Sequence, residues 1–136
     1  MILLDTNICI YFVNEDKEYH PRILDKLTKY PRNSVFLSNA TVAELYYGAE
    51  NSQLQEFNYR LFNRFISKFQ IIPFDKAQAQ HYAKIRHILK NQNRKIGDMD
   101  IIIASCAMAN NFTLVTNNEK DFVYIDGLKV ENWAKK

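Results

Sequence analysis

The sequence has no long apolar run and few residues that interrupt regular structure. Its 136 residues include only three glycines and three prolines, which favours helices and strands over linkers. The longest apolar segment, 101–109, is far shorter than the roughly 18 residues that a membrane helix requires. The N-terminal segment has no basic leader and is not typical of a signal peptide. These absences predict a cytoplasmic protein that does not cross a membrane.

Cysteine and histidine are also scarce. Neither the two cysteines nor the three histidines show the CxxC or HExxH spacing of a zinc site. Cys9 and Cys106 lie among apolar residues, so buried thiols are expected rather than a disulfide. The histidines have no nucleophile at a useful spacing and are expected on helix faces.

The remaining composition is that of an ordinary globular domain. Hydrophobic residues make up 47% of the chain and charged residues 24%, and the length is typical of one domain. The formal net charge of +3 permits a polyanionic partner without requiring one.

Apolar segments with strand and helix patterns alternate along the chain. This alternation predicts an α/β fold around a mainly parallel sheet. The expected strands are 1–4, 35–38, 70–74, 112–116 and a short last strand from 123–125 and 128–130. The expected helices are 7–14, 20–30, one capped by Asn39 or Thr41 and ending near Gly48, 53–68, 75–93, and 98–110 capped by Asp98.

Four acidic residues fall where the predicted strands and helices meet. Asp5 ends the first strand, Asp121 lies in the loop after the fourth, and Glu44 and Asp100 lie near helix starts. Parallel sheets bind ligands at the carboxyl ends of their strands. Two carboxylates about 4 Å apart repel by roughly 4 kcal/mol at an effective dielectric near 20. A clustered set would therefore need a hard divalent cation, Mg²⁺ or Mn²⁺.

Each of these acids also has a simpler interpretation. Asp5 can serve only as a helix cap, while Glu44 and Asp121 can be ordinary solvated acids. Asp98 and Asp100 both begin an apolar helix, where acids favour the positive end of the helix dipole. Asp98 suits the cap better, and Asp100 is the better metal candidate.

Two further surface features have alternative interpretations. The basic residues Arg86, Lys90, Arg94 and Lys95 either bind RNA phosphates or form a solvated helix face. The aromatic residues of 53–68 have helical spacing, which favours core or dimer contact over base stacking.

The chain resembles the PIN-domain family, and within it the VapC toxins of toxin–antitoxin pairs. The resemblance is carried by MILLDTNICIY, VAELYYGAE, IGDMDIIIASCAMANNFTLVTNN and FVYIDGLKVENW. It implies a single PIN domain over 1–136, a three-layer α/β/α sandwich, and Mg²⁺- or Mn²⁺-dependent cleavage of RNA. It also implies a VapB-like antitoxin partner and a homodimer.

The resemblance assigns roles to individual residues. Asp5 and Glu44 match the first two family acids, and Asp100, three residues beyond Gly97, matches the third. The fourth is either Asp121 or, with an amide in its place, Asn118. The supporting polar positions are Asn7, Thr116, Asn117 and Asn118. Relatives with the TNICIY segment suggest transfer RNA as substrate, in the anticodon region of the initiator.

Two rival functions are compatible with the fold. One is a non-catalytic RNA-binding PIN domain, against which the complete set of acids argues. The other is an α/β domain that acts through an aspartyl phosphate, which normally needs an acid pair at one strand end. Asp5 follows four apolar residues and has no such neighbour.

Overall fold

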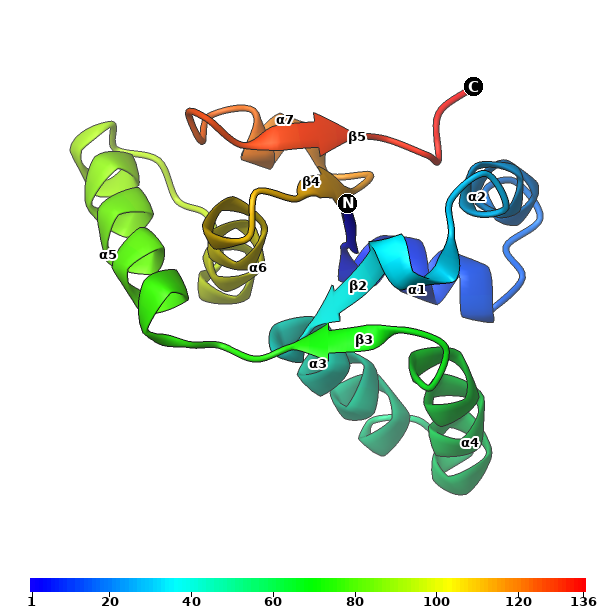
Figure 1. The fold of residues 1–136 in the computed structure, drawn as a ribbon. Coiled ribbons are helices and arrows are strands. Elements are labelled where there is room, and N and C mark those ends of the chain that lie inside the picture. The colour runs from blue at the N-terminus through cyan, green and yellow to red at the C-terminus, as the bar shows by residue number, and fades with distance from the viewer.

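The computed structural model describes all 136 residues as thirteen elements around one sheet. The five strands are all parallel, in the order β3-β2-β1-β4-β5 (Figure 1). The strands are β1 (Ile2–Leu4), β2 (Val35–Ser38), β3 (Gln70–Ile72), β4 (Thr113–Val115) and β5 (Lys129–Glu131). The helices are α1 (Thr6–Val13), α2 (His20–Leu27), η1 (Arg32–Ser34), α3 (Asn39–Glu50), α4 (Gln55–Ile66), α5 (Lys76–Asn91), α6 (Asp98–Ala109) and α7 (Glu119–Phe122).

The sheet separates two apolar cores, as the alternation of side chains along a strand requires. In β1, Ile2 and Leu4 belong to the core shared with α1, α2, α3 and α4. Leu3 belongs to the core shared with α5, α6 and α7. The predicted three-layer α/β/α sandwich is confirmed, with helices on both faces of the sheet (Figure 1).

Helix α3 and the end of the sheet differ in detail from the sequence prediction. Ser38, not Asn39 or Thr41, caps α3, because its hydroxyl accepts the backbone N–H of Thr41. Residues 123–125 are not a strand, since the short helix α7 ends just before them. Only 129–131 pair with β4 to form the last strand.

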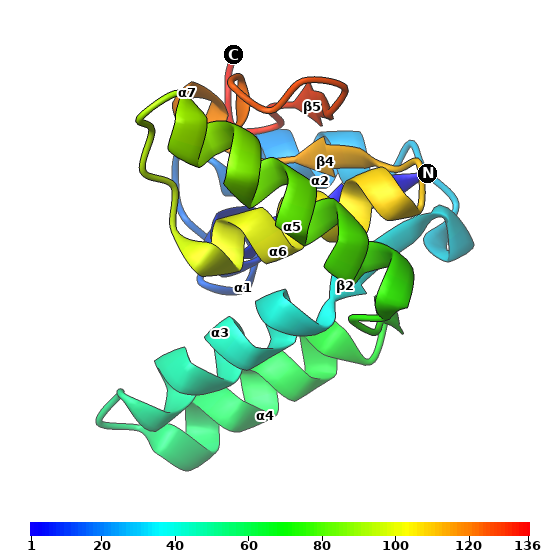
Figure 2. The same ribbon diagram turned by 90° about the vertical axis from the view of Figure 1, so that its left-hand side faces the viewer.

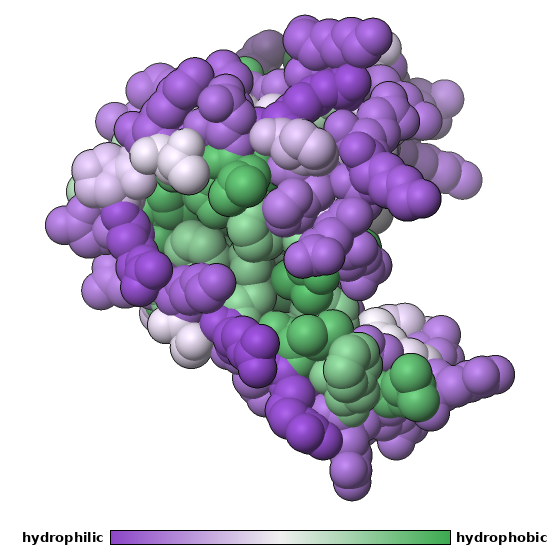
Figure 3. All heavy atoms as spheres, turned by 90° about the vertical axis from the view of Figure 1, so that its right-hand side faces the viewer, coloured by the Kyte–Doolittle hydropathy of each residue, from purple (hydrophilic) through white to green (hydrophobic).

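Helices α3 and α4 form an antiparallel pair that extends away from the rest of the molecule (Figure 2). Phe62 and Phe65 of α4 are buried, as expected for core residues, whereas Phe57 is 54% exposed. An apolar surface lies in the hollow between this pair and the body (Figure 3). Both cysteines are buried free thiols, as predicted. No helix has the length and apolar character needed to cross a membrane.

Candidate active site

Asp5 lies where β1 ends and α1 begins, and both of its carboxylate oxygens accept hydrogen bonds. Oδ1 accepts the backbone N–H of Thr6 at 2.8 Å, which caps α1. Oδ2 accepts the hydroxyl of Thr116 at 2.6 Å. The pairing of Leu4 with Val115 places these residues side by side. Burial raises the pKa of Asp5, although the bonds from Thr116 and Thr6 oppose the shift.

Glu44 is oriented by hydroxyl groups rather than by a cation. Its Oε1 accepts the hydroxyl of Thr6 at 2.5 Å. The Oγ1 atoms of Thr6 and Thr41 lie 3.2 Å apart, and Ser38 Oγ lies 3.3 Å from Thr41 Oγ1. A hydroxyl has one proton to donate, so Thr41 donates to Thr6 when Thr6 donates to Glu44. The residue that follows Asp5 therefore also fixes the second acid.

Asp121 lies on α7 rather than in a loop, and the polar segment before α7 holds it. Asn118 Nδ2 donates to Asp121 Oδ2 at 2.9 Å, and the Asn118 backbone N–H donates to Thr116 Oγ1 at 2.9 Å. The Asn117 backbone N–H donates to Asn7 Oδ1 at 3.3 Å, and Asn7 Nδ2 lies 3.5 Å from Thr116 Oγ1. Asp121 and Asn118, the two alternatives for the fourth family position, are therefore in direct contact.

Asp100 is half-buried, and the charges of the other three acids all affect its pKa. Its pKa is raised to about 6, first by burial and then by the charges of Asp5, Glu44 and Asp121. The structure therefore brings the four predicted acids into one electrostatic group, although they come from four separate parts of the chain.

Asp98 does not have the capping role predicted for it. Gly97 occupies the cap position of α6, and Asp98 is the first helical residue. Its side chain is exposed and accepts the hydroxyl of Tyr82 at 3.2 Å. A backbone that is already extended at Gly97 starts the helix without a capping side chain, so Asp98 is free to contact α5.

The acidic group has no basic partner within the chain. The three ion pairs of the structure involve Glu18, Asp25 and Glu119, not any of the four acids. No three acid, histidine or cysteine side chains are arranged as a ready cage for a metal ion. Mg²⁺ does not need such a cage, because it keeps several waters and binds one or two carboxylates directly. The donor set therefore fits a hydrated Mg²⁺ or Mn²⁺ ion.

Comparison with known proteins defines the family. The protein-family model for the PIN domain matches residues 2–128 of the chain. Over 133 residues the chain is 39% identical to Ribonuclease VapC2 of Rickettsia felis, covering 98% of each protein. Over 132 residues it is 34% identical to the tRNA(fMet)-specific endonuclease VapC of Shigella flexneri, covering 97% of each. The chain is a PIN-domain protein of the VapC ribonuclease family.

The structure of this PIN domain agrees with that membership. It matches a chain in the crystal structure of VapBC2 from Rickettsia felis bound to a DNA fragment from their promoter, with a TM-score of 0.87 and 39% identity. The match covers 98% of this chain and 99% of that chain. The predicted family, fold and enzyme class are confirmed.

The predicted RNA-binding residues of the PIN domain share one hollow, whose lining includes none of the four acids. Arg86, Lys90, Arg94 and Lys95 line a hollow of about 510 Å³ that also includes Gly97 at the start of α6. The Arg94 guanidinium lies 3.4 Å from the centroid of the exposed Tyr124 ring, which is the geometry of a cation–π contact. Asp98, in the first turn of α6, also lines this hollow, whereas Asp100 of the same turn does not.

Several residues of the site in this PIN domain were not found from the sequence. Thr6 and Thr41 orient Glu44, while Tyr11 and Asn132 contact Asn117. The signal for Thr6 was its place inside the DTN segment, and the signal for Asn132 was its place inside ENW. Tyr11 and Thr41 had none, because only the packing of α1 brings them to these partners.

Proposed function

We propose that this PIN domain is a divalent-metal-dependent endoribonuclease toxin that cleaves transfer RNA. The observation that carries the proposal is the group of Asp5, Glu44, Asp100 and Asp121. Burial and mutual repulsion raise the pKa of Asp100 to about 6, and no lysine or arginine compensates for the charge. Such an arrangement is unfavourable unless it serves to hold a cation.

The four acids would hold Mg²⁺ or Mn²⁺, directly or through water. When bound, the ion supplies a water of lowered pKa and neutralises charge on the scissile phosphate. The hydroxyl of Thr116 holds the Asp5 carboxylate, and the hydroxyl of Thr6 holds that of Glu44. These neutral donors orient the acids without cancelling their charge, so the site remains attractive to a cation.

The basic hollow would bind the RNA backbone. Arg86, Lys90, Arg94 and Lys95 lie beside the first turn of α6, which is the turn that carries Asp100. Transfer RNA is the proposed substrate because the related Shigella flexneri protein is named a tRNA(fMet)-specific endonuclease. By the same reasoning, the initiator species is the first candidate.

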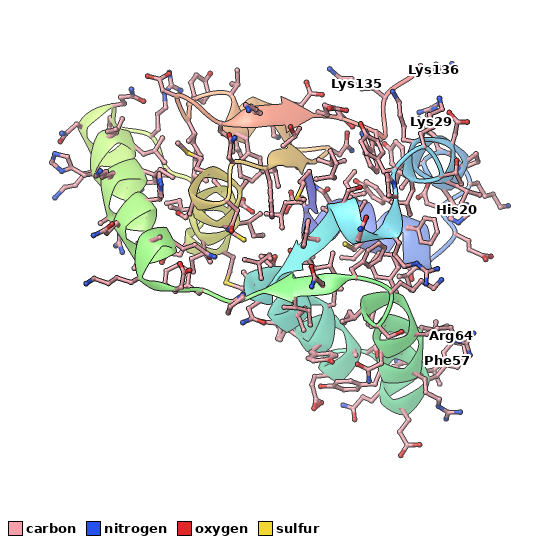
Figure 4. All side chains as sticks on the ribbon, in the orientation of Figure 1. His20, Lys29, Phe57, Arg64, Lys135 and Lys136 are labelled. Atoms are coloured by element: carbon pink, nitrogen blue, oxygen red, sulfur yellow. The ribbon has the colours of Figure 1, made fainter.

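The partners proposed for this cytoplasmic toxin are a VapB-like antitoxin and a second copy of the chain. The Rickettsia felis neighbour is a VapBC complex. Tyr47, Leu54 and Phe57 are exposed and lie on or beside the α3–α4 pair. Figure 4 shows Phe57 and Arg64 of α4 on the same side of the molecule as His20. An apolar surface of this kind is typical of a protein interface.

A cleavage assay tests the proposed function. End-labelled transfer RNA is incubated with the parent protein and with Asp5→Ala, each with Mg²⁺ and with EDTA. Only the parent protein with Mg²⁺ is expected to give products. Equal cleavage in EDTA would rule out the metal mechanism. RNA binding without cleavage under every condition would support the alternative, a non-catalytic RNA-binding PIN domain.

A further inference from the structure

The segment 131–134, with the sequence ENWA, has no part in the chemistry proposed above, yet its side chains reach the site. We propose that Asn132 is a positioning residue for the active site, which it serves by holding the 116–121 segment that carries Thr116, Asn118 and Asp121. The inference rests on the proposed function and adds the C-terminal segment to its machinery.

Asn132 uses both ends of its amide. Its Nδ2 donates to Asn117 Oδ1 at 2.9 Å, and its Oδ1 accepts the backbone N–H of Ala134 at 2.8 Å. A side chain held in this way has a single orientation, and it contacts the residue that precedes Asn118.

Asn117 passes this constraint to the acids. Its Nδ2 donates to the hydroxyl of Tyr11 at 3.2 Å, and its backbone N–H donates to Asn7 Oδ1. The amide is therefore held between α1 on one side and the C-terminal segment on the other. Thr116, the neighbour of Asn117, donates to Asp5, so a shift of Asn117 would move the donor that orients the first acid.

The C-terminal segment is itself firmly anchored and can serve as a support. Trp133 is 1% exposed and stacks on Tyr30 with ring centroids 5.4 Å apart. The carbonyl oxygen of Ala134 accepts Arg22 Nη1 at 2.6 Å. These contacts tie the segment to α2 and to Tyr30, which lies between α2 and η1. Figure 1 shows the C-terminal end of the chain running from β5 towards α2.

The site needs such a support because its acids repel one another. Asp121 has the same charge as Asp5, Glu44 and Asp100, so repulsion among the four carboxylates favours outward movement of the segment bearing Asp121. Residues that orient metal ligands from behind typically change metal affinity or activity by about 10–100-fold when they are replaced. An effect of that order separates a positioning role from a local turn-forming role of Asn132.

The test uses Asn132→Asp, which keeps the oxygen that accepts Ala134 N–H and replaces the amide donor. The Mn²⁺ affinity is measured by calorimetry without RNA, and backbone hydrogen exchange at Asn117 and Asn118 is measured in metal-free protein. We expect about tenfold weaker Mn²⁺ binding, faster exchange at both amides, and a lower kcat with unchanged KM for RNA. Lys129→Ala is the matched control: it removes an exposed lysine near the C-terminus whose hydrogen bond goes to Asn111, outside the 116–121 segment, and it is expected to stay within twofold of the parent.

The inference is overturned if folded Asn132→Asp binds Mn²⁺ as tightly as the parent and keeps both amides protected. If that variant does not fold, Asn117→Ala removes the acceptor and leaves the Asn132–Ala134 bond in place, and the same criteria apply to it. A parent protein that neither binds Mn²⁺ nor cleaves RNA contradicts the proposed function instead. The exchange measurement then still decides whether Asn132 holds the segment.

Discussion

At the scale of single residues, the site is built from acids whose partners are neutral. Thr116 donates to Asp5 at 2.6 Å and Thr6 donates to Glu44 at 2.5 Å. A lysine or arginine in either place would have oriented the carboxylate equally well but would have cancelled its charge. Threonine hydroxyls keep the geometry and the charge together, while burial raises the pKa of both Asp5 and Asp100.

Replacement of Asp100 by asparagine should stabilise the metal-free protein. The pKa of Asp100 is raised from 3.8 to about 6, so the folded state holds this proton more tightly than the unfolded state. Its contribution is fully present below pH 4 and is lost as the pH rises through about 6. In EDTA at pH 7, Asp100→Asn should unfold with a free energy about 1–2 kcal/mol higher than the parent, after allowance for solvent screening.

Urea unfolding at pH 4 and pH 7 measures this effect. The gain should vanish at pH 4, where the parent carboxyl is protonated, and RNA cleavage should be abolished at both values. A variant less stable than the parent at pH 7 would show that the carboxylate is satisfied in the native state and is not held for a cation.

Replacement of Thr116 by valine should weaken metal binding without disrupting β4, the strand that ends just before it. The buried hydroxyl donates to Asp5 and accepts from Asn118 N–H, and leaving these groups unpaired costs about 1–3 kcal/mol. We expect Mn²⁺ affinity to fall by about 10–100-fold, as measured by calorimetry. Thr113→Val, in β4 just before Thr116, is the control, since no side-chain hydrogen bond of Thr113 is present in the structure. Equal losses in both variants would assign the effect to the strand alone.

At the scale of elements, α5 and the connection to α6 concentrate positive charge beside the first turn of α6. Four cations line one hollow, and one of them, Arg94, is stacked on Tyr124. A surface that binds phosphates releases counterions, so its affinity for RNA depends on salt concentration. Arg86 is likewise held by a tyrosine, since its Nη1 donates to the hydroxyl of Tyr82 at 2.9 Å.

Removal of a single charge from the hollow should reduce the salt dependence of RNA binding. In an Asp100→Asn background, Lys90→Gln or Lys95→Gln should lower the slope of log affinity against log salt by about one. Fluorescence anisotropy with labelled transfer RNA measures the slope. Lys129→Gln, on β5, is the matched control and should leave it unchanged. Identical slopes for all three variants would place the RNA elsewhere.

At the scale of the whole molecule, the fold brings four carboxylates together, and a bound cation would offset their repulsion. The acids come from the junction of β1 and α1 and from α3, α6 and α7, so an ion at the site would join elements on both faces of the sheet. Mg²⁺ at about one hundred times its dissociation constant should raise the free energy of unfolding by about 2.7 kcal/mol. Thermal melts with Mg²⁺ and with EDTA measure this gain, and Asp5→Asn should remove it. An equal gain in Asp5→Asn would indicate binding at another site.

Local sequence patterns predicted most of the fold because its elements have strong local signals. The buried run 2–4, the amphipathic helices α4 and α5, and the apolar helix α6 were all found close to their observed bounds. Errors occurred where neighbours compete for one role. Ser38 caps α3 in place of Asn39 or Thr41, and Gly97, rather than Asp98, occupies the N-cap position of α6. Propensity ranks such residues closely, and only the backbone geometry decides between them.

The sequence alone determined which acids follow strands and begin helices, because those positions depend on local patterns of apolar residues. It did not determine what holds the acids in place. The contacts of Thr6 with Glu44, of Thr116 with Asp5, and of Asn132 with Asn117 join residues 15 to 111 positions apart. Contacts over such separations exist only once the parallel sheet has aligned the ends of β1, β2, β4 and β5, so tertiary structure alone decides them.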